Sequence, residues 1–455
     1  MTRPIPELAG LATYAQAATI GCSVAESVRR LVRAHWAELR LMDVLLAHLP
    51  GTPEWEVKCG MALHQWQHAA HASLLRERIA EMRNPAPRLD VTPDDALEAL
   101  FAELERSADT VELLTGVYVV VRPALASAYR AHHGEENPLV AQPTRRVLQM
   151  ILADEVDAIT WAASALRSLV AEDPAARERS EAWRKHLEGY LARCGGVEGR
   201  EPSEAAVPPP RATTPFRPDL TPKRDTRFRG QRDFDFPPHV IYNDPRVPPD
   251  ERNLALLCKR ALEMDVPEMM ASILVEWRSL PWDLRHALSR QLWDEARHAM
   301  MGTVALEARG VDWTRIPLNI GFALRLNRHA TPIERQIMLW AIEQSLMPRD
   351  TGKRAEYETA READDALSTH FHDYDWADEV LHTRIGRQVL KHAGVAPADA
   401  TARAAEIHER TWQALDAYRG TEEAAGWWDA FVREALGHPS ALATADMQQL
   451  RILTE

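Results

Sequence analysis

The chain has 455 residues and a formal net charge of −13, with 67 acidic against 54 basic side chains. This length accommodates two or three domains with hydrophobic cores, whereas the acidic charge argues against a nucleic-acid partner, which needs a basic surface. No stretch reaches 18 apolar residues, so no membrane-spanning helix is expected. The four scattered cysteines form neither a metal-binding spacing nor a disulfide framework, so we expect a cytoplasmic protein without a membrane partner.

The composition predicts an all-α fold. Long segments rich in Ala, Leu, Arg and Glu contain almost no alternating β-branched runs. Helical periodicity predicts a first helical domain over residues 1–195. Within it, His64, His68 and His71 follow the spacing i, i+4 and i+7 and so share one helix face. Three imidazoles could hold zinc or copper, but no clear fourth ligand follows, and purely structural histidines remain the alternative.

Residues 196–245 are rich in Pro, Arg and Asp, a composition that cannot form a packed helix. Between Arg211 and Arg232 there are seven basic residues against two acidic ones. One interpretation is an extended interdomain linker. The other, which we favour, is an ordered strap across the acidic body, because four aromatic side chains offer apolar anchors: Phe216, Phe228, Phe234 and Phe236.

Helical patterning resumes near Pro249 and predicts a second helical domain over 246–395 and a C-terminal helical extension over 396–455. The second domain contains Glu-x-x-His twice, as Glu295-Ala296-Arg297-His298 and Glu379-Val380-Leu381-His382. Positions i and i+3 share a helix face, so each pair can present a carboxylate and an imidazole to one metal ion. A single copy is weak evidence, but two copies 84 residues apart (379 − 295) favour a metal site.

Two further glutamates complete the pattern of a dimetal site, in which two helices carry Glu-x-x-His and two others carry one Glu each. Glu268 precedes Glu295 by 27 residues (295 − 268), about as far before the turn at Pro281 as Glu295 lies after it. Glu276 is too near this turn and Glu263 is rather far from it.

For the second pair, Glu343 lies in the apolar run Met338–Glu343, where an unpaired carboxylate would be costly. Glu356 and Glu358 compete with it, but their charged neighbours are typical of a solvated face. An acid also precedes each paired Glu. Asp294 and Asp378 could each accept the remaining ring N–H of a ligating histidine and fix its orientation, or could be ordinary surface acids.

Asp294-Glu295-Ala296-Arg297-His298 and Asp378-Glu379-Val380-Leu381-His382, with Glu268 and Glu343 upstream, resemble the ferritin-like superfamily of carboxylate-bridged non-haem di-iron proteins. The nearest likeness is an uncharacterised bacterial ferritin-like family in which a Pro/Arg-rich segment, here TPFRPDLTPKRDTRF over 214–228, leads into the bundle.

The resemblance covers about residues 210–395 and implies a four-helix bundle there. It also implies that Glu295 and Glu379 bridge or chelate the metals and are the catalytic residues. Each histidine, His298 and His382, would ligate one metal, with Glu268 and Glu343 as terminal ligands.

The mixed carboxylate and imidazole ligands suit two iron ions, and manganese fits them as well. Six protein ligands leave coordination positions for O2 as co-substrate, so we expect an O2-activating di-iron oxidase or mono-oxygenase. It would act on a small organic molecule and draw electrons from an unknown reductant. The alternatives are an enzyme like the tRNA hydroxylases, or an iron-handling or peroxide-scavenging protein. Pairing of the bundle into a homodimer is left open.

The sequence also contains signs of an internal duplication. Ala153-Asp154-Glu155-Val156 repeats Ala377-Asp378-Glu379-Val380 letter for letter, but Ala158 takes the place of His382. The place of Glu343 falls near Tyr118 or Val119.

Glu38 precedes Gln65 by 27 residues (65 − 38), which matches the spacing from Glu268 to Glu295, and His68 then stands where His298 stands. The first domain is therefore expected to be a related but degenerate bundle that has lost most of its ligands. Chance similarity between two helical domains is the alternative.

Overall fold

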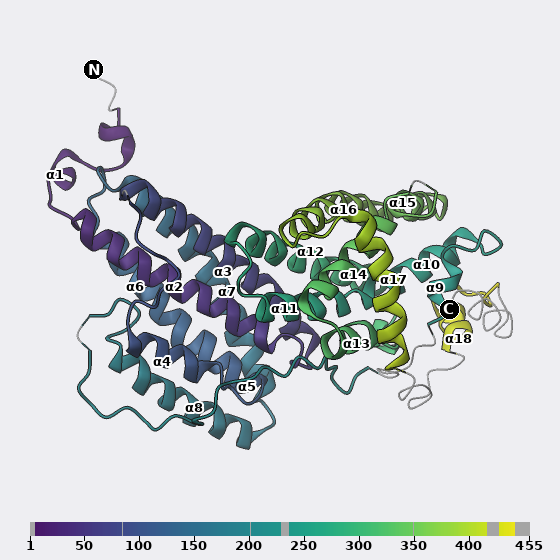
Figure 1. The fold of residues 1–455 in the computed structure, drawn as a ribbon, viewed down its shortest axis with the longest axis horizontal. Coiled ribbons are helices and arrows are strands. Elements are labelled where there is room, and N and C mark those ends of the chain that lie inside the picture. The colour runs from purple at the N-terminus through teal and green to yellow at the C-terminus, as the bar shows by residue number, and fades with distance from the viewer. Residues whose placement is uncertain are drawn as a thin grey trace. The chain divides into compact units, whose positions relative to one another are not determined.

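A computed structural model describes residues 5–83, 85–200, 202–228, 236–348, 350–415 and 427–441. Within these ranges the protein is all-helical and contains no strand (Figure 1), which confirms the predicted all-α class. It forms two compact units. Unit 1 comprises Met1–Leu45 and His64–Pro218, and unit 2 comprises Leu46–Leu63 and Asp219–Glu455. The predicted boundaries differ from this division, because the Pro/Arg-rich segment is shared between the units and residues 46–63 group with unit 2.

Unit 1 is built around long helices that share an apolar core. Its helices, two of which extend into unit 2, are α1 (Tyr14–Ala17), α2 (Val24–His48), α3 (Trp55–Met82), α4 (Asp95–Leu104), α5 (Thr110–Leu114), the π-helical η2 (Thr115–Val121), α6 (Arg122–Glu135), α7 (Gln142–Leu169) and α8 (Pro174–Arg193). Aspartate side chains cap several of them: Asp94 accepts from the Leu97 N–H and Asp173 from the Ala176 N–H. Trp36 packs edge-on against Phe101 in the core.

One stretch of unit 1, Thr110–Glu135, is long and apolar enough to cross a membrane. Of its most apolar window, 72% is buried inside the structure. A central helix of a packed unit has the same properties, so this stretch is weak evidence for a membrane span and does not decide where the protein is located.

Unit 2 contains the helices α9 (Pro238–Ile241), α10 (Pro249–Leu262), α11 (Asp265–Glu276), α12 (Trp282–Glu307), α13 (Gly321–His329), α14 (Pro332–Ser345), α15 (Lys353–Glu362), α16 (Ala366–His392), α17 (Pro397–Gln413) and α18 (Trp427–Leu436). Helix α12 packs against α10, α11 and α16, while α16 also packs against α14 and α15. Helices α10, α12, α14 and α16 thus form a contiguous set, and the two Glu-x-x-His pairs lie on α12 and α16.

The Pro/Arg-rich segment is ordered against helices in both units. In unit 1 the Arg211 guanidinium lies 3.9 Å from the ring centroid of Trp183 and pairs with Glu112. In unit 2 the Phe228 ring is buried between Trp55 and Trp313, with centroids 6.1 and 5.5 Å away. These contacts are what an ordered strap requires. Of the other predicted anchors, Phe236 is buried and Phe234 lies outside the described residues.

Candidate metal centre

Four of the predicted ligands in unit 2 form one group in the structure. Glu295, Glu343, Glu379 and His382 are buried and each offers a ligand atom within 4.8 Å of the others. The His382 Nδ1 atom lies 3.0 Å from Glu295 Oε1, 3.3 Å from Glu379 Oε2 and 3.9 Å from Glu343 Oε1. Helices α12, α14 and α16 therefore bring three carboxylates to one imidazole nitrogen.

A second group adjoins the first and contains Glu263, His298 and Asp375. The His298 Nδ1 atom lies 3.3 Å from Asp375 Oδ1 and 3.9 Å from Glu263 Oε2. It also lies 3.7 Å from Glu295 Oε2 and 4.0 Å from Glu379 Oε1. Glu295 and Glu379 thus each direct one oxygen towards His382 and the other towards His298, which is the arrangement a bridging carboxylate needs.

Glu268, the sixth predicted ligand, is not brought to this site. It is buried on α11, where it pairs with Lys58 and Arg224. The spacing argument assumed a single helix before the turn at Pro281, but the chain ends one helix at Leu262 and starts another at Asp265. Glu263, which lies rather far from the turn in sequence, follows the end of α10 and faces His298 in place of Glu268.

Asp294 and Asp378 each lie beside the Nε2 atom of a histidine on the other helix: Asp294 of α12 contacts His382 of α16, and Asp378 of α16 contacts His298 of α12. His298 Nε2 lies 3.2 Å from Asp378 Oδ2, and His382 Nε2 lies 3.5 Å from Asp294 Oδ2. A carboxylate at this position fixes the ring so that the opposite nitrogen faces the metal. Although burial opposes it, hydrogen bonds from His382 and Arg297 lower the pKa of Asp294 to about 2, which keeps it an acceptor.

The inward atoms of these residues lack hydrogen bonds to any described residue. They are Glu295 Oε1, Glu379 Oε2, His298 Nδ1 and His382 Nδ1. Buried polar atoms are nearly always hydrogen-bonded, because leaving them unsatisfied costs free energy. A metal ion between them would satisfy all four, so the residues present fit a metal centre. The buried Glu/His groups could hold a metal ion.

Two buried cations, Lys353 and Arg260, pair with carboxylates of the second group, and Lys353 also pairs with Glu379 of the first. Lys353 Nζ lies 2.9 Å from Asp375 Oδ1 and 2.8 Å from Glu379 Oε1. The Arg260 guanidinium lies 2.6 Å from both Glu263 and Asp375. Although burial opposes it, the Lys353 ammonium holds the pKa of Glu379 well below its usual value.

Among the residues that the structure describes, no lysine or arginine pairs with Glu343. Burial and the nearby carboxylates of Glu379 and Glu295 raise the pKa of Glu343 well above its usual value. Its Oε1 atom accepts a hydrogen bond of 3.1 Å from Gln291 Nε2. The first group thus carries an excess of carboxylate that a divalent cation would neutralise.

Sequence reasoning did not identify Asp375, Lys353 or Arg260. Asp375 lies four residues before Glu379 and shares its helix face, so the spacing could have identified it. Lys353 and Arg260 lie on α15 and α10 and no motif marks them. In a further group, Glu356 with His372 and Asp375, Glu356 pairs with Lys259 and Arg260, and the ring nitrogens of His372 make no hydrogen bond to a described residue.

Comparison of the chain with protein-family models, with curated proteins and with solved structures found no match.

Proposed function

We propose that unit 2 is a ferritin-like bundle whose centre holds two metal ions, and that the protein is a non-haem di-iron oxidoreductase acting on a small organic molecule. The observation that carries the proposal is the placement of Glu295 and Glu379, each with one oxygen towards His298 and the other towards His382. In ferritin-like bundles, two Glu-x-x-His helices and two further glutamates make the dimetal site.

Each proposed ion has its own set of ligands. One would be held by His382 and Glu343, the other by His298, Glu263 and Asp375, with Glu295 and Glu379 shared. Iron bound there would supply one-electron redox chemistry and a place for O2 reduction, and manganese fits the same ligands.

The remaining residues tune and protect this centre. If all five carboxylates are ionised, as metal ligands must be, they would carry a net charge of −3 together with Lys353 and Arg260, and two divalent ions would convert this to +1. Asp294 and Asp378 hold the two imidazoles in one orientation. All the ligands are at most 14% exposed by side chain, so the protein excludes bulk water from the centre and strengthens its electrostatic interactions.

The experiment is anaerobic iron loading of the full chain, metal analysis, and an optical spectrum recorded before and after exposure to O2. We expect Glu379→Ala to lose the iron of unit 2 together with any O2-dependent spectral change. A variant that keeps both would contradict the proposal. Iron uptake beyond the ligand sets would favour iron handling instead, and binding of the iron-loaded protein to tRNA would favour an enzyme like the tRNA hydroxylases.

A further inference from the structure

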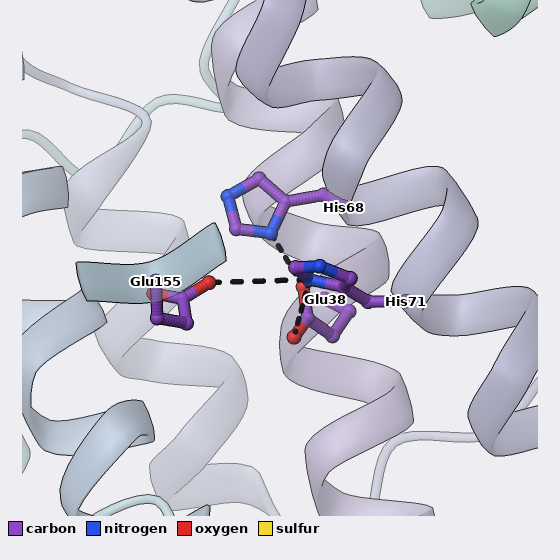
Figure 2. Close-up of side chains that lie close together, drawn as sticks. All are labelled: Glu38, His68, His71 and Glu155. Atoms are coloured by element: carbon purple, nitrogen blue, oxygen red, sulfur yellow. Dashed lines mark hydrogen bonds and ion pairs between the residues drawn. The ribbon is translucent and has the colours of Figure 1, made fainter. Parts of the chain in front are cut away.

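Unit 1 contains a buried group of two histidines and two glutamates. Glu38 of α2, His68 and His71 of α3, and Glu155 of α7 point towards one another (Figure 2). Each offers a ligand atom within 4.8 Å of the others, and none is more than 2% exposed. The sequence comparison pairs Glu38 with Glu268 and Gln65 with Glu295, and this pairing does not bring Glu38, His71 and Glu155 together.

His71 has the orientation of a metal ligand. Its Nε2 atom lies 3.0 Å from Asp154 Oδ2, so Asp154 holds the outer side of the ring. Its Nδ1 atom makes no hydrogen bond to any described residue and lies 3.4 Å from Glu38 Oε1 and 4.0 Å from Glu155 Oε1. Ligand atoms bound to one tetrahedral ion at about 2.1 Å lie about 3.4 Å apart, so these separations suit a shared ion.

His68 completes the group from the same helix face. Its Nδ1 atom pairs with Glu38 Oε2. His64, one turn earlier, turns away, because its Nδ1 atom lies 2.7 Å from the hydroxyl of Tyr118. The histidine triad considered from the sequence is therefore divided: two members belong to the group, and Glu38 and Glu155 are the ligands that the spacing of the histidines could not show.

The same helix order carries the ligands in both units. Glu38 corresponds to Glu263 (263 − 38 = 225), and Glu155 corresponds to Glu379 (379 − 155 = 224). The helix between them presents His68-x-x-His71 where unit 2 presents Glu295-x-x-His298, both at an offset of 227. An aspartate also contacts the Nε2 atom of the corresponding histidine in both units: Asp154 contacts His71, and Asp378 contacts His298. These offsets replace the earlier pairing of Glu38 with Glu268.

Unit 1 retains only half of the ligand pattern. Ala158 stands where His382 would be (382 − 224 = 158). Arg122 donates two hydrogen bonds of 2.9 and 3.0 Å to the Glu155 carboxylate, and Tyr129 donates one of 2.6 Å to Glu38 Oε1. The guanidinium supplies one positive charge beside Glu155. With both histidines neutral, as metal ligation requires, the two carboxylates then keep one uncompensated negative charge, which suits a single divalent ion.

From this geometry we infer that unit 1 holds a single divalent first-row transition-metal ion between Glu38, His68, His71 and Glu155. Two imidazoles and two carboxylates are borderline ligands that suit zinc and iron(II) rather than calcium or magnesium. The inference does not depend on the dimetal centre proposed for unit 2, since the two ligand sets have no residue in common.

The test uses the full chain loaded with Zn²⁺, with metal per chain measured after removal of unbound ion. We expect His71→Gln to bind one zinc fewer than the wild type, while the control His64→Gln, a buried histidine of the same helix outside the group, binds as much as the wild type. Circular dichroism checks that both variants fold. Equal zinc content in His71→Gln and the wild type would overturn the inference.

A second measurement needs no variant. An anomalous-difference map from crystals of the zinc-loaded wild type should show a peak within bonding distance of His71 Nδ1 and Glu38. The absence of a peak there, with or without peaks in unit 2, would show that the group is an ion-pair network of charged histidines and carboxylates without metal.

Discussion

The buried groups of unit 1 and unit 2 share part of one pattern of carboxylates and histidines but differ in the number of ions that we propose for them. In unit 2, Glu295 and Glu379 lie between two histidines. Glu343 lies beside His382, and Glu263 and Asp375 lie beside His298. In unit 1, Ala158 removes one imidazole and Arg122 occupies the free side of Glu155. Unit 1 also has His68 where unit 2 has Glu295, and Tyr118 or Val119 near the place of Glu343. We attribute the proposed change from two ions to one to the loss of these ligands together with the cation beside Glu155.

Resident cations also divide the centre of unit 2 itself. Lys353 and Arg260 compensate Glu263, Asp375 and Glu379, whereas Glu343 has no such partner and its pKa is raised by burial and by neighbouring carboxylates. We therefore expect the first ion to enter the group of His382 and Glu343, where no neighbouring lysine or arginine of the described residues repels it and where it can replace the proton that burial favours on Glu343, and the second to enter beside His298.

The largest expected effect follows from removing a shared carboxylate. Glu379→Ala should abolish both ions of unit 2, because Glu379 directs an oxygen towards each histidine, and should leave the single ion of unit 1. Metal analysis of the purified variant measures this. Loss of metal from both units would point to unfolding, and an unchanged total would contradict the shared role.

A pair of matched substitutions separates Glu263 from Glu268. Glu263→Gln should reduce unit 2 from two ions to one, because its carboxylate faces His298. Glu268→Gln should keep full metal content but lower the melting temperature, since it removes the charge between Lys58 and Arg224; breaking a buried ion pair costs about 3–5 kcal/mol. The opposite pattern would return Glu268 to the ligand set.

Lys353→Met tests whether a resident cation stands in for metal. In the metal-free protein this change should reduce the free energy of unfolding by about 3–5 kcal/mol, because Asp375 and Glu379 lose a buried partner. In the iron-loaded protein the loss should be smaller, since the ions supply the missing charge. Thermal unfolding with and without chelator measures both, and the exposed Lys391→Met is the control. An equal loss in both states would show that Lys353 acts independently of metal.

The smallest effect concerns the outer carboxylates. Asp154→Asn should weaken metal binding in unit 1 alone, and Asp378→Asn in unit 2 alone, each by about 10–100-fold. Each aspartate accepts from the outer nitrogen of one histidine, His71 or His298. Competition against a chelator of known affinity gives the change. If Asp154→Asn had no effect on metal affinity, His71 would not be oriented by this contact.

Much of the centre of unit 2 could be predicted from the sequence, because helix periodicity converts an i, i+3 spacing into a shared face. That reasoning supplied both Glu-x-x-His pairs and the aspartates that precede them. It failed at Glu268, where it assumed an unbroken helix. Pro267 was the available signal, since a proline cannot donate to the carbonyl four residues earlier and so favours a break near Glu263.

Other features depend on contacts between elements that no local pattern encodes. Lys353 and Arg260 reach the centre from α15 and α10. Their ion pairs with the carboxylates of the centre form only when these helices pack together. In unit 1, the spacing identified the histidines but not their partners, because Glu38 and Glu155 come from α2 and α7. A buried carboxylate is a candidate ligand, but its burial depends on contacts between helices that are distant in the sequence, so it cannot be read from the local sequence.

The most direct test is the number of metal ions per chain after anaerobic loading with iron(II), measured for the wild type, Glu379→Ala and His71→Gln. The ligand sets predict about three ions in the wild type, about one in Glu379→Ala and about two in His71→Gln. The same metal content in all three proteins would contradict the account, because it would show that neither buried group holds metal.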